Sequence, residues 1–137
     1  MMKSFPLNSP KKPVTVLYIE DDFANRQLVR LIMAKRNDIQ LFEAETGTAG
    51  LESLNAHHPD IVLLDLSLPD LSGYEILARI RHDYNMNSTP VIAVSGNSHP
   101  DDISRGLKAG FQAYLTKPIV ITKLFKTLDT AIHSLPK

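Results

Sequence analysis

Apolar and amphipathic blocks alternate along this chain, and their order predicts five β-strands and five α-helices. Each strand candidate is a short apolar run, too brief for a helix of ordinary length. Each helix candidate is a longer segment in which apolar residues recur at helical spacing. The strands are expected at 14–19, 39–44, 61–64, 91–94 and 113–115, and the helices at 23–35, 46–57, 73–82, 100–109 and 121–133.

Local signals mark several helix ends. Asp22 is expected to cap the first helix, and Ser72 and Glu75 stand at the S-x-x-E spacing of a capping box. Pro100 suits the first turn of the fourth helix, and Gly110 follows its last residue. In the first helix the apolar face is predicted to contain Phe23, Ala24, Leu28, Leu31 and Ile32, with Arg26, Arg30 and Arg36 largely on the opposite side.

The alternation of strands and helices indicates an α/β fold of (βα)₅ type. In such a doubly wound fold, a five-stranded parallel sheet carries helices on both faces. The length of 137 residues corresponds to one domain. The first 13 residues, with three prolines and three lysines, are expected to form a flexible N-terminal arm, so that the domain spans 14–137.

Composition narrows the function further. Fifteen basic and fifteen acidic residues cancel, so no net field attracts nucleic acid or an anionic membrane. Cysteine is absent, which excludes a disulfide framework and a thiolate metal site. No apolar run approaches the roughly 18 residues that span a bilayer. We therefore expect a cytoplasmic protein that does not bind nucleic acid or membrane directly.

Charged and hydroxyl residues follow four of the predicted strands, and in α/β sheets these strand ends lie on one edge, where ligands bind. Taken singly, an acid at such a point is typical of a turn or a helix N-terminus. Together, however, carboxylates at about 4 Å repel by about 4 kcal/mol per pair at an effective dielectric near 20, so the cluster favours a cation. Oxygen ligands favour Mg²⁺ or Mn²⁺. The residues concerned are Glu20, Asp21, Asp65, Ser95 and Lys117.

The same groups are those that phosphoryl transfer to an aspartate requires. Asp65 can attack phosphorus in line, a metal can neutralise oxygens, and Lys117 and Ser95 can bind the remaining phosphoryl oxygens. The combination is far more specific than any one of its members.

Four motifs carry a family resemblance: VLYIEDD, DIVLLDLSLPDLSG, PVIAVSG and GFQAYLTKP. In order and separation they resemble a response-regulator receiver domain, the phosphoacceptor module of bacterial two-component signalling. The run YIEDDFANRQLVR is similar to receivers of hybrid histidine kinases. The resemblance covers the chain from Val14 to Leu135 and implies a flavodoxin-like sheet with strand order 2-1-3-4-5.

The resemblance also implies roles for individual residues. Asp65 would be the phosphoacceptor, assisted by Lys117 and Ser95, and the Lys117–Pro118 peptide bond would be cis. Ser95 and Tyr114 would form the switch. The magnesium ligands would be Glu20, Asp21, Asp65 and the backbone carbonyl of Ser67.

The partners follow from the same resemblance. A histidine kinase or a histidine phosphotransfer protein would supply the phosphoryl group from a phosphohistidine. The signal would leave through the surface of the fourth helix, fifth strand and last helix, toward a target protein or a second copy. The chain would catalyse only its own phosphorylation and slow dephosphorylation.

Three positions depart from the commoner receiver pattern without removing a chemical group. Ile119 stands where Phe is frequent, and Gly96 follows Ser95 where Ala is usual. Val120 replaces a polar N-cap, so the last helix is expected to begin poorly capped or to be capped by Thr122.

Two other function classes stay open on the residues alone. A magnesium-dependent phosphatase or phosphotransferase could use an aspartyl-phosphate, but dehalogenase-like hydrolases carry a second Asp where this chain has Ser67. A flavodoxin-like nucleotide-binding module is opposed by the acidic pocket. The five histidines show no metal-ligand spacing and are expected to be solvated and not phosphorylated. The sequence fits both a stand-alone regulator and a piece of a longer protein.

Overall fold

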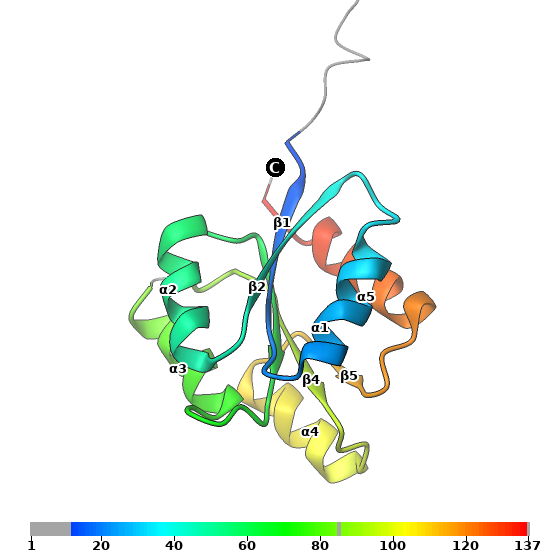
Figure 1. Cartoon of the computed structure of the whole chain (residues 1–137). Coiled ribbons are helices and arrows are strands. Elements are labelled where there is room, and N and C mark those ends of the chain that lie inside the picture. The colour runs from blue at the N-terminus through cyan, green and yellow to red at the C-terminus, as the bar shows by residue number, and fades with distance from the viewer. Residues whose placement is uncertain (1–11, 85, 137) are drawn as a thin grey trace, which may run out of the picture.

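A computed structural model describes residues 12–84 and 86–136 of the chain. Strands and helices alternate from end to end (Figure 1), as the sequence predicts. The predicted N-terminal arm at 1–13 falls almost entirely outside the described residues. The strands are β1 (Val14–Ile19), β2 (Ile39–Ala44), β3 (Ile61–Asp65), β4 (Val91–Ser95) and β5 (Ala113–Thr116). The helices are α1 (Phe23–Met33), α2 (Gly47–His57), α3 (Gly73–His82), α4 (Pro100–Ala109) and α5 (Ile121–His133).

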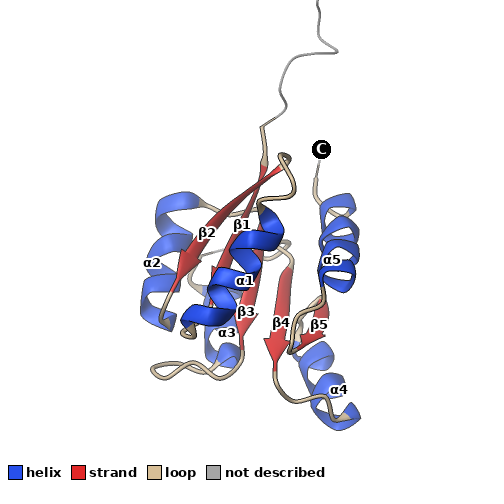
Figure 2. Cartoon of the chain, turned by 45° about the vertical axis from the view of Figure 1, so that its right-hand side comes forward, coloured by secondary structure: helices blue, strands red, loops and turns tan. Residues whose placement is uncertain are grey.

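The strands form one parallel, flavodoxin-like sheet in the order β2-β1-β3-β4-β5, which confirms the expected topology. Figure 2 shows the five strands between helices that lie on both sides. The register of the paired strands aligns the carboxyl ends of β1, β3 and β4: Ile19 lies beside Leu64, and Asp65 lies beside Val94. The residues that follow β1 and end β3 therefore meet at one edge of the sheet.

The sheet has two separate cores because successive strand residues point to opposite faces. On one face, Tyr18 and Leu63 pack beneath α1 and α5. On the other face, Ile19 and Leu64 pack beneath α2 and α3. In Figure 1, α2 and α3 lie on the left of the sheet, and α1 and α5 on the right.

The predicted caps largely hold. The Asp22 side chain accepts from the Asn25 N–H, and Ser72 and Glu75 form both bonds of the capping box. Gly110 ends α4 with a φ of 115°, a left-handed conformation that favours glycine. Val120 precedes α5 without a side-chain cap bond, as expected, and Thr122 does not replace it. Within the described ranges, no helix is long and apolar enough to cross a membrane.

The predicted apolar face of α1 is confirmed at Ile32, which is buried, and is wrong at its other positions. Phe23, Leu28 and Leu31 are 59 %, 38 % and 62 % exposed. The positions that face the sheet are spaced three and four residues apart from position 26 onward, as the helical repeat requires. The buried residues of α1 are Arg26, Val29, Ile32 and Met33.

Arg26 is the most unexpected member of this buried set, since arginines are seldom buried unless paired. Its Nη1 donates to the backbone carbonyl of Glu20 at 2.8 Å, and its Nη2 donates to the Glu45 carboxylate at 3.1 Å. The guanidinium thus ties the end of β1 to the loop after β2. These charge-assisted bonds offset the cost of burying the cation.

Candidate functional site

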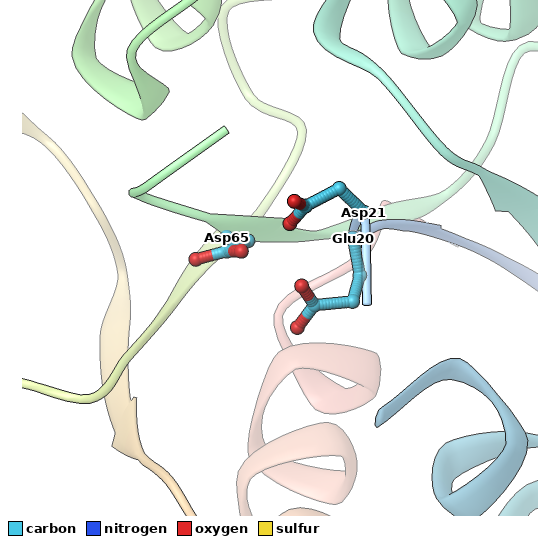
Figure 3. Close-up of side chains that lie close together, drawn as sticks. All are labelled: Glu20, Asp21 and Asp65. Atoms are coloured by element: carbon cyan, nitrogen blue, oxygen red, sulfur yellow. The ribbon is translucent and has the colours of Figure 1, made fainter. Parts of the chain in front are cut away.

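Three carboxylates converge at the carboxyl edge of the sheet (Figure 3). Glu20 follows β1, Asp21 comes next, and Asp65 ends β3. One oxygen from each lies within 4.8 Å of the others. Glu20 and Asp65 are buried, at 0 % and 2 % exposure, whereas Asp21 is exposed. The register of β1 and β3 explains this meeting, because pairing of Ile19 with Leu64 puts Glu20 level with Asp65.

Lys117 supplies the balancing positive charge. It directly follows β5, and its backbone N–H donates to the Ser95 carbonyl at 2.8 Å. Its Nζ lies 2.8 Å from Glu20 Oε1 and 3.4 Å from Asp65 Oδ2. Burial alone would lower the pKa of Lys117, but the hydrogen bond to Glu20 and the charges of Asp65 and Glu20 outweigh burial and raise it. The amine therefore stays protonated. The Lys117–Pro118 peptide bond is cis, as the resemblance implied.

Glu20 is held by further contacts within its own strand and loop. The Tyr18 hydroxyl donates to Glu20 Oε1 at 3.0 Å, and the Asp22 N–H donates to Oε2 at 3.3 Å. Since Arg26 binds its backbone carbonyl, Glu20 is fixed at both the main chain and the carboxylate. Tyr18 and Arg26 were missed as site residues from the sequence. Strand alternation could have found Tyr18, which is two residues before Glu20 and so faces the same side.

Asp65 is held from the following loop. The Ser67 N–H donates to Asp65 Oδ1 at 3.0 Å, and Ser67 pairs with Ser72 in an isolated bridge that closes the loop. Asp70 anchors the same loop to α2: its carboxylate accepts from the N–H groups of Gly47 and Thr48 at 2.8 and 2.9 Å. These bonds lower the pKa of Asp70 to about 2.

Ser95 and Tyr114, the expected switch pair, both bond to Asn97 in the loop after β4. Ser95 ends β4 and is buried, and its Oγ accepts from the Asn97 N–H at 3.1 Å. Tyr114 is half-buried on β5, and its hydroxyl donates to the Asn97 carbonyl at 3.0 Å. Its ring lies against Gly106 of α4. One backbone residue therefore joins both side chains.

The donor set fits a hard divalent cation. Each of the three carboxylates offers an oxygen, two of the residues are buried, and the exposed Asp21 leaves access from solvent. Mg²⁺ and Mn²⁺ prefer oxygen ligands and commonly keep part of their water shell. Glu20, Asp21 and Asp65 could therefore hold a metal ion.

Comparison with known proteins shows to which family this chain belongs. The model of the response regulator receiver domain matches residues 16–129. The chain belongs to the response regulator receiver domain family. This receiver is 30 % identical over 116 residues to the polar-differentiation response regulator DivK of Brucella ovis, covering 85 % of this chain and 94 % of DivK.

A second response regulator and a solved response-regulator structure support the same family. The receiver is 40 % identical over 118 residues to the cell cycle response regulator CtrA of Brucella ovis, covering 86 % of this chain and 50 % of CtrA. The crystal structure of the Mn(2+)-bound response regulator Rcp1 superposes with a TM-score of 0.72 at 28 % identity, covering 91 % of this chain and 100 % of Rcp1. The chain is thus a receiver of two-component signalling, a class of signalling proteins and not of conventional enzymes.

All five histidines of the receiver are exposed, as predicted, but two make specific contacts. The ring of His57 stacks on Phe42 with centroids 3.9 Å apart. His99 Nδ1 accepts from the Asp101 N–H and so caps α4. Histidine at this position was not predicted to cap a helix.

Proposed function

We propose that this receiver accepts a phosphoryl group on Asp65 from a phosphohistidine of a histidine kinase or a histidine phosphotransfer protein. One observation carries the proposal: the Asp65 carboxylate lies 3.4 Å from the Lys117 ammonium, inside a carboxylate cluster that suits a divalent cation. We expect the reaction to occur in the cytoplasm and to require Mg²⁺ or Mn²⁺.

The chemistry is an in-line displacement. An Asp65 oxygen forms the new O–P bond, the N–P bond of the phosphohistidine breaks, and the imidazole nitrogen keeps the electron pair and takes up a proton. Glu20, Asp21, Asp65 and the Ser67 backbone carbonyl would hold the metal, which neutralises phosphoryl oxygens when bound. Lys117 would move toward a phosphoryl oxygen, and Ser95 would donate its hydroxyl to another.

The exposed apolar side of α1 supports docking of a protein donor. Phe23 and Leu31 are 59 % and 62 % exposed, and α1 begins three residues after Glu20. A phosphohistidine must reach the same sheet edge, so its carrier would cover this helix. Leu31→Ser should therefore slow transfer from a phosphorylated partner protein and leave labelling by acetyl phosphate unchanged. An equal effect on both donors would remove α1 from the docking surface.

The signal is proposed to leave through the surface of α4, β5 and α5. Acyl phosphate at Asp65 adds charge and acceptor oxygens, which would draw the Ser95 hydroxyl away from Asn97. Movement of Ser95 would vacate space, which Tyr114 would fill by turning inward and giving up its bond to the Asn97 carbonyl. An apolar patch on α4 that includes Leu107, 46 % exposed, together with charged residues, would contact a target or a second copy. The charged candidates are Asp101, Arg105, Lys108, Lys123 and Lys126.

Intact-mass measurement tests the central claim. Wild type incubated with Mg²⁺ and acetyl phosphate should gain one phosphoryl group, and Asp65→Asn should gain none. Asp21→Ala should lose metal binding and labelling together, because the change removes a ligand and not the acceptor. Equal labelling of wild type and Asp65→Asn would refute the assignment. Turnover of small phosphate esters would instead favour the phosphatase alternative.

A further inference from the structure

One oxygen of Glu20 has two hydrogen-bond donors, one from β1 and one from the residue that follows β5. Lys117 Nζ lies 2.8 Å from Glu20 Oε1, and the Tyr18 hydroxyl donates to the same oxygen at 3.0 Å. Glu20 has no exposed surface, so apart from a metal ion on its carboxylate this oxygen depends on protein donors. A buried carboxylate that loses its donors is strongly destabilised.

The two donors differ in how far they can move. Tyr18 lies within β1 with 0 % exposure, packed in the core beneath α1 and α5. Lys117 lies beyond the end of β5, has a flexible side chain that is 21 % exposed, and already contacts Asp65 Oδ2 at 3.4 Å. Transfer of the lysine to a phosphoryl oxygen on Asp65 would break its bond to Glu20, while the tyrosine bond can persist.

We infer that Tyr18 is a positioning residue that keeps the Glu20 oxygen hydrogen-bonded while Lys117 turns to the phosphoryl group on Asp65. The inference rests on the proposed phosphorylation of Asp65. Without the hydroxyl, Glu20 would have to retain the lysine as a donor. Lys117 would then be less available to the transferring phosphoryl group, although every metal ligand stayed in place.

The surroundings of Tyr18 suit this role. The Tyr18 side chain is fully buried, and its hydroxyl is held 3.0 Å from Glu20 Oε1. The remainder of Glu20 is fixed independently, by the Asp22 N–H on Oε2 and by Arg26 on the backbone carbonyl. Removing the hydroxyl should therefore change how Lys117 is shared and leave the backbone at the end of β1 in place.

Tyr18→Phe tests the inference because it removes one oxygen and keeps the ring. The maximal rate of Asp65 phosphorylation by acetyl phosphate should fall about tenfold, the lower end of the range for a hydrogen bond to a charged group. Mg²⁺ affinity, measured by fluorescence or calorimetry, should stay within about twofold of wild type, as expected for a group that is not a ligand. Tyr84→Phe, just beyond the C-terminal end of α3, is the matched control and should change neither quantity.

A double-mutant cycle separates action through Glu20 from a general packing effect. In a Glu20→Gln background the charge that binds Lys117 is gone, so adding Tyr18→Phe should alter the phosphorylation rate by less than about twofold. A full tenfold loss in that background, a parallel loss of Mg²⁺ affinity in Tyr18→Phe, or an unchanged rate in Tyr18→Phe would each overturn the inference.

Failure of the proposed function would be visible separately, as a wild type that acetyl phosphate does not label on Asp65. Crystal structures of wild type and Tyr18→Phe with Mg²⁺ would still decide the positional claim. The distance from Lys117 Nζ to Asp65 should be longer in the variant, with Nζ closer to Glu20. Identical lysine positions in the two structures would refute it.

Discussion

The carboxylate cluster and the loop after β4 lie at the same edge of the sheet but are held very differently. Glu20 receives four contacts, from Tyr18, Lys117, the Asp22 N–H and Arg26. The loop after β4 is joined to Ser95 and Tyr114 through the backbone of one residue, Asn97. A Cβ placed on Gly96 would have no neighbour within 4 Å.

This difference matches what each region would have to do. Groups that bind a metal and a phosphoryl group must be held in place before the reaction, since preorganised charges need no rearrangement. A switch needs two arrangements that differ by only a few kcal/mol. Ser95 and Tyr114 are joined through the backbone of Asn97. These two hydrogen bonds are few enough for a new phosphoryl acceptor on Asp65 to outweigh them. Amino-acid substitutions can test this difference between the carboxylate cluster and the loop after β4.

The largest effect is expected from removing the Lys117 ammonium, which contacts both Glu20 and Asp65. Lys117→Ala should slow phosphorylation by acetyl phosphate about a hundredfold, as for loss of a donor to a developing anion. Without Mg²⁺ it should also lower the free energy of unfolding by about 1–3 kcal/mol, because Glu20 loses a buried donor. The exposed Lys35→Ala serves as control. Normal phosphorylation of Lys117→Ala would show the lysine to be structural.

A second, smaller effect should separate the two regions directly. Beryllofluoride, a mimic of the phosphoryl group, should be added together with Mg²⁺. It should change the hydrogen-exchange rates of amides across 95–114 and in α5 by up to about tenfold, the effect of one hydrogen bond to a charged group. The amides of β1 should change little. Asp65→Asn should show no response. Changes confined to Asp65 and Asp21 would remove Ser95 and Tyr114 from the switch.

A third effect concerns Tyr114 alone. A Cβ on Gly106 would lie 2.9 Å from Tyr114 Cδ2, so in Gly106→Ala either the ring or α4 must shift, and we expect the ring to move. The bond from Tyr114 to Asn97 should weaken, and exchange of the 96–99 amides should rise about two- to fivefold without phosphorylation. Labelling of Asp65 should stay within about twofold of wild type.

Gly96→Ala is the matched control for that variant, because its Cβ meets open space. An unmoved Tyr114 resonance in Gly106→Ala would show that α4 yields in place of the ring. Movement of Tyr114 would then not be coupled to α4. The proposal that the signal passes from Tyr114 to the α4 surface would be contradicted.

The fold could be predicted because each signal was local. Strand alternation, the Ser72–Glu75 capping box and Gly110 after α4 each depend on a few neighbouring residues. The meeting of Glu20, Asp21, Asp65 and Lys117 followed equally from strand ends in a parallel sheet. Strands β3, β4 and β5 each run one residue further than predicted, because Asp65, Ser95 and Thr116 still belong to the sheet.

What could not be predicted depends on contacts between distant segments. Nothing in the α1 sequence indicates that Arg26 is buried while Leu31 is exposed, because the hydrogen-bond partners of Arg26 are the Glu20 carbonyl after β1 and Glu45 beyond β2. The anchoring of the β3–α3 loop on α2 through Asp70 likewise spans 22 and 23 residues. Polar partners at such separations leave no periodic pattern.

The smallest predicted effect tests that anchor. The pKa of Asp70 is lowered to about 2 from 3.8 by the N–H groups of Thr48 and Gly47. A lowered folded-state pKa means that the stabilisation is complete above about pH 4 and is lost as pH falls toward 2. In urea unfolding, Asp70→Asn should therefore be less stable than wild type at pH 7, and the difference should shrink steadily below pH 4. Glu52→Gln on α2 is the control, with no such convergence. A wild-type advantage that stayed constant down to the lowest pH of cooperative unfolding would mean that the anchor does not depend on the carboxylate charge.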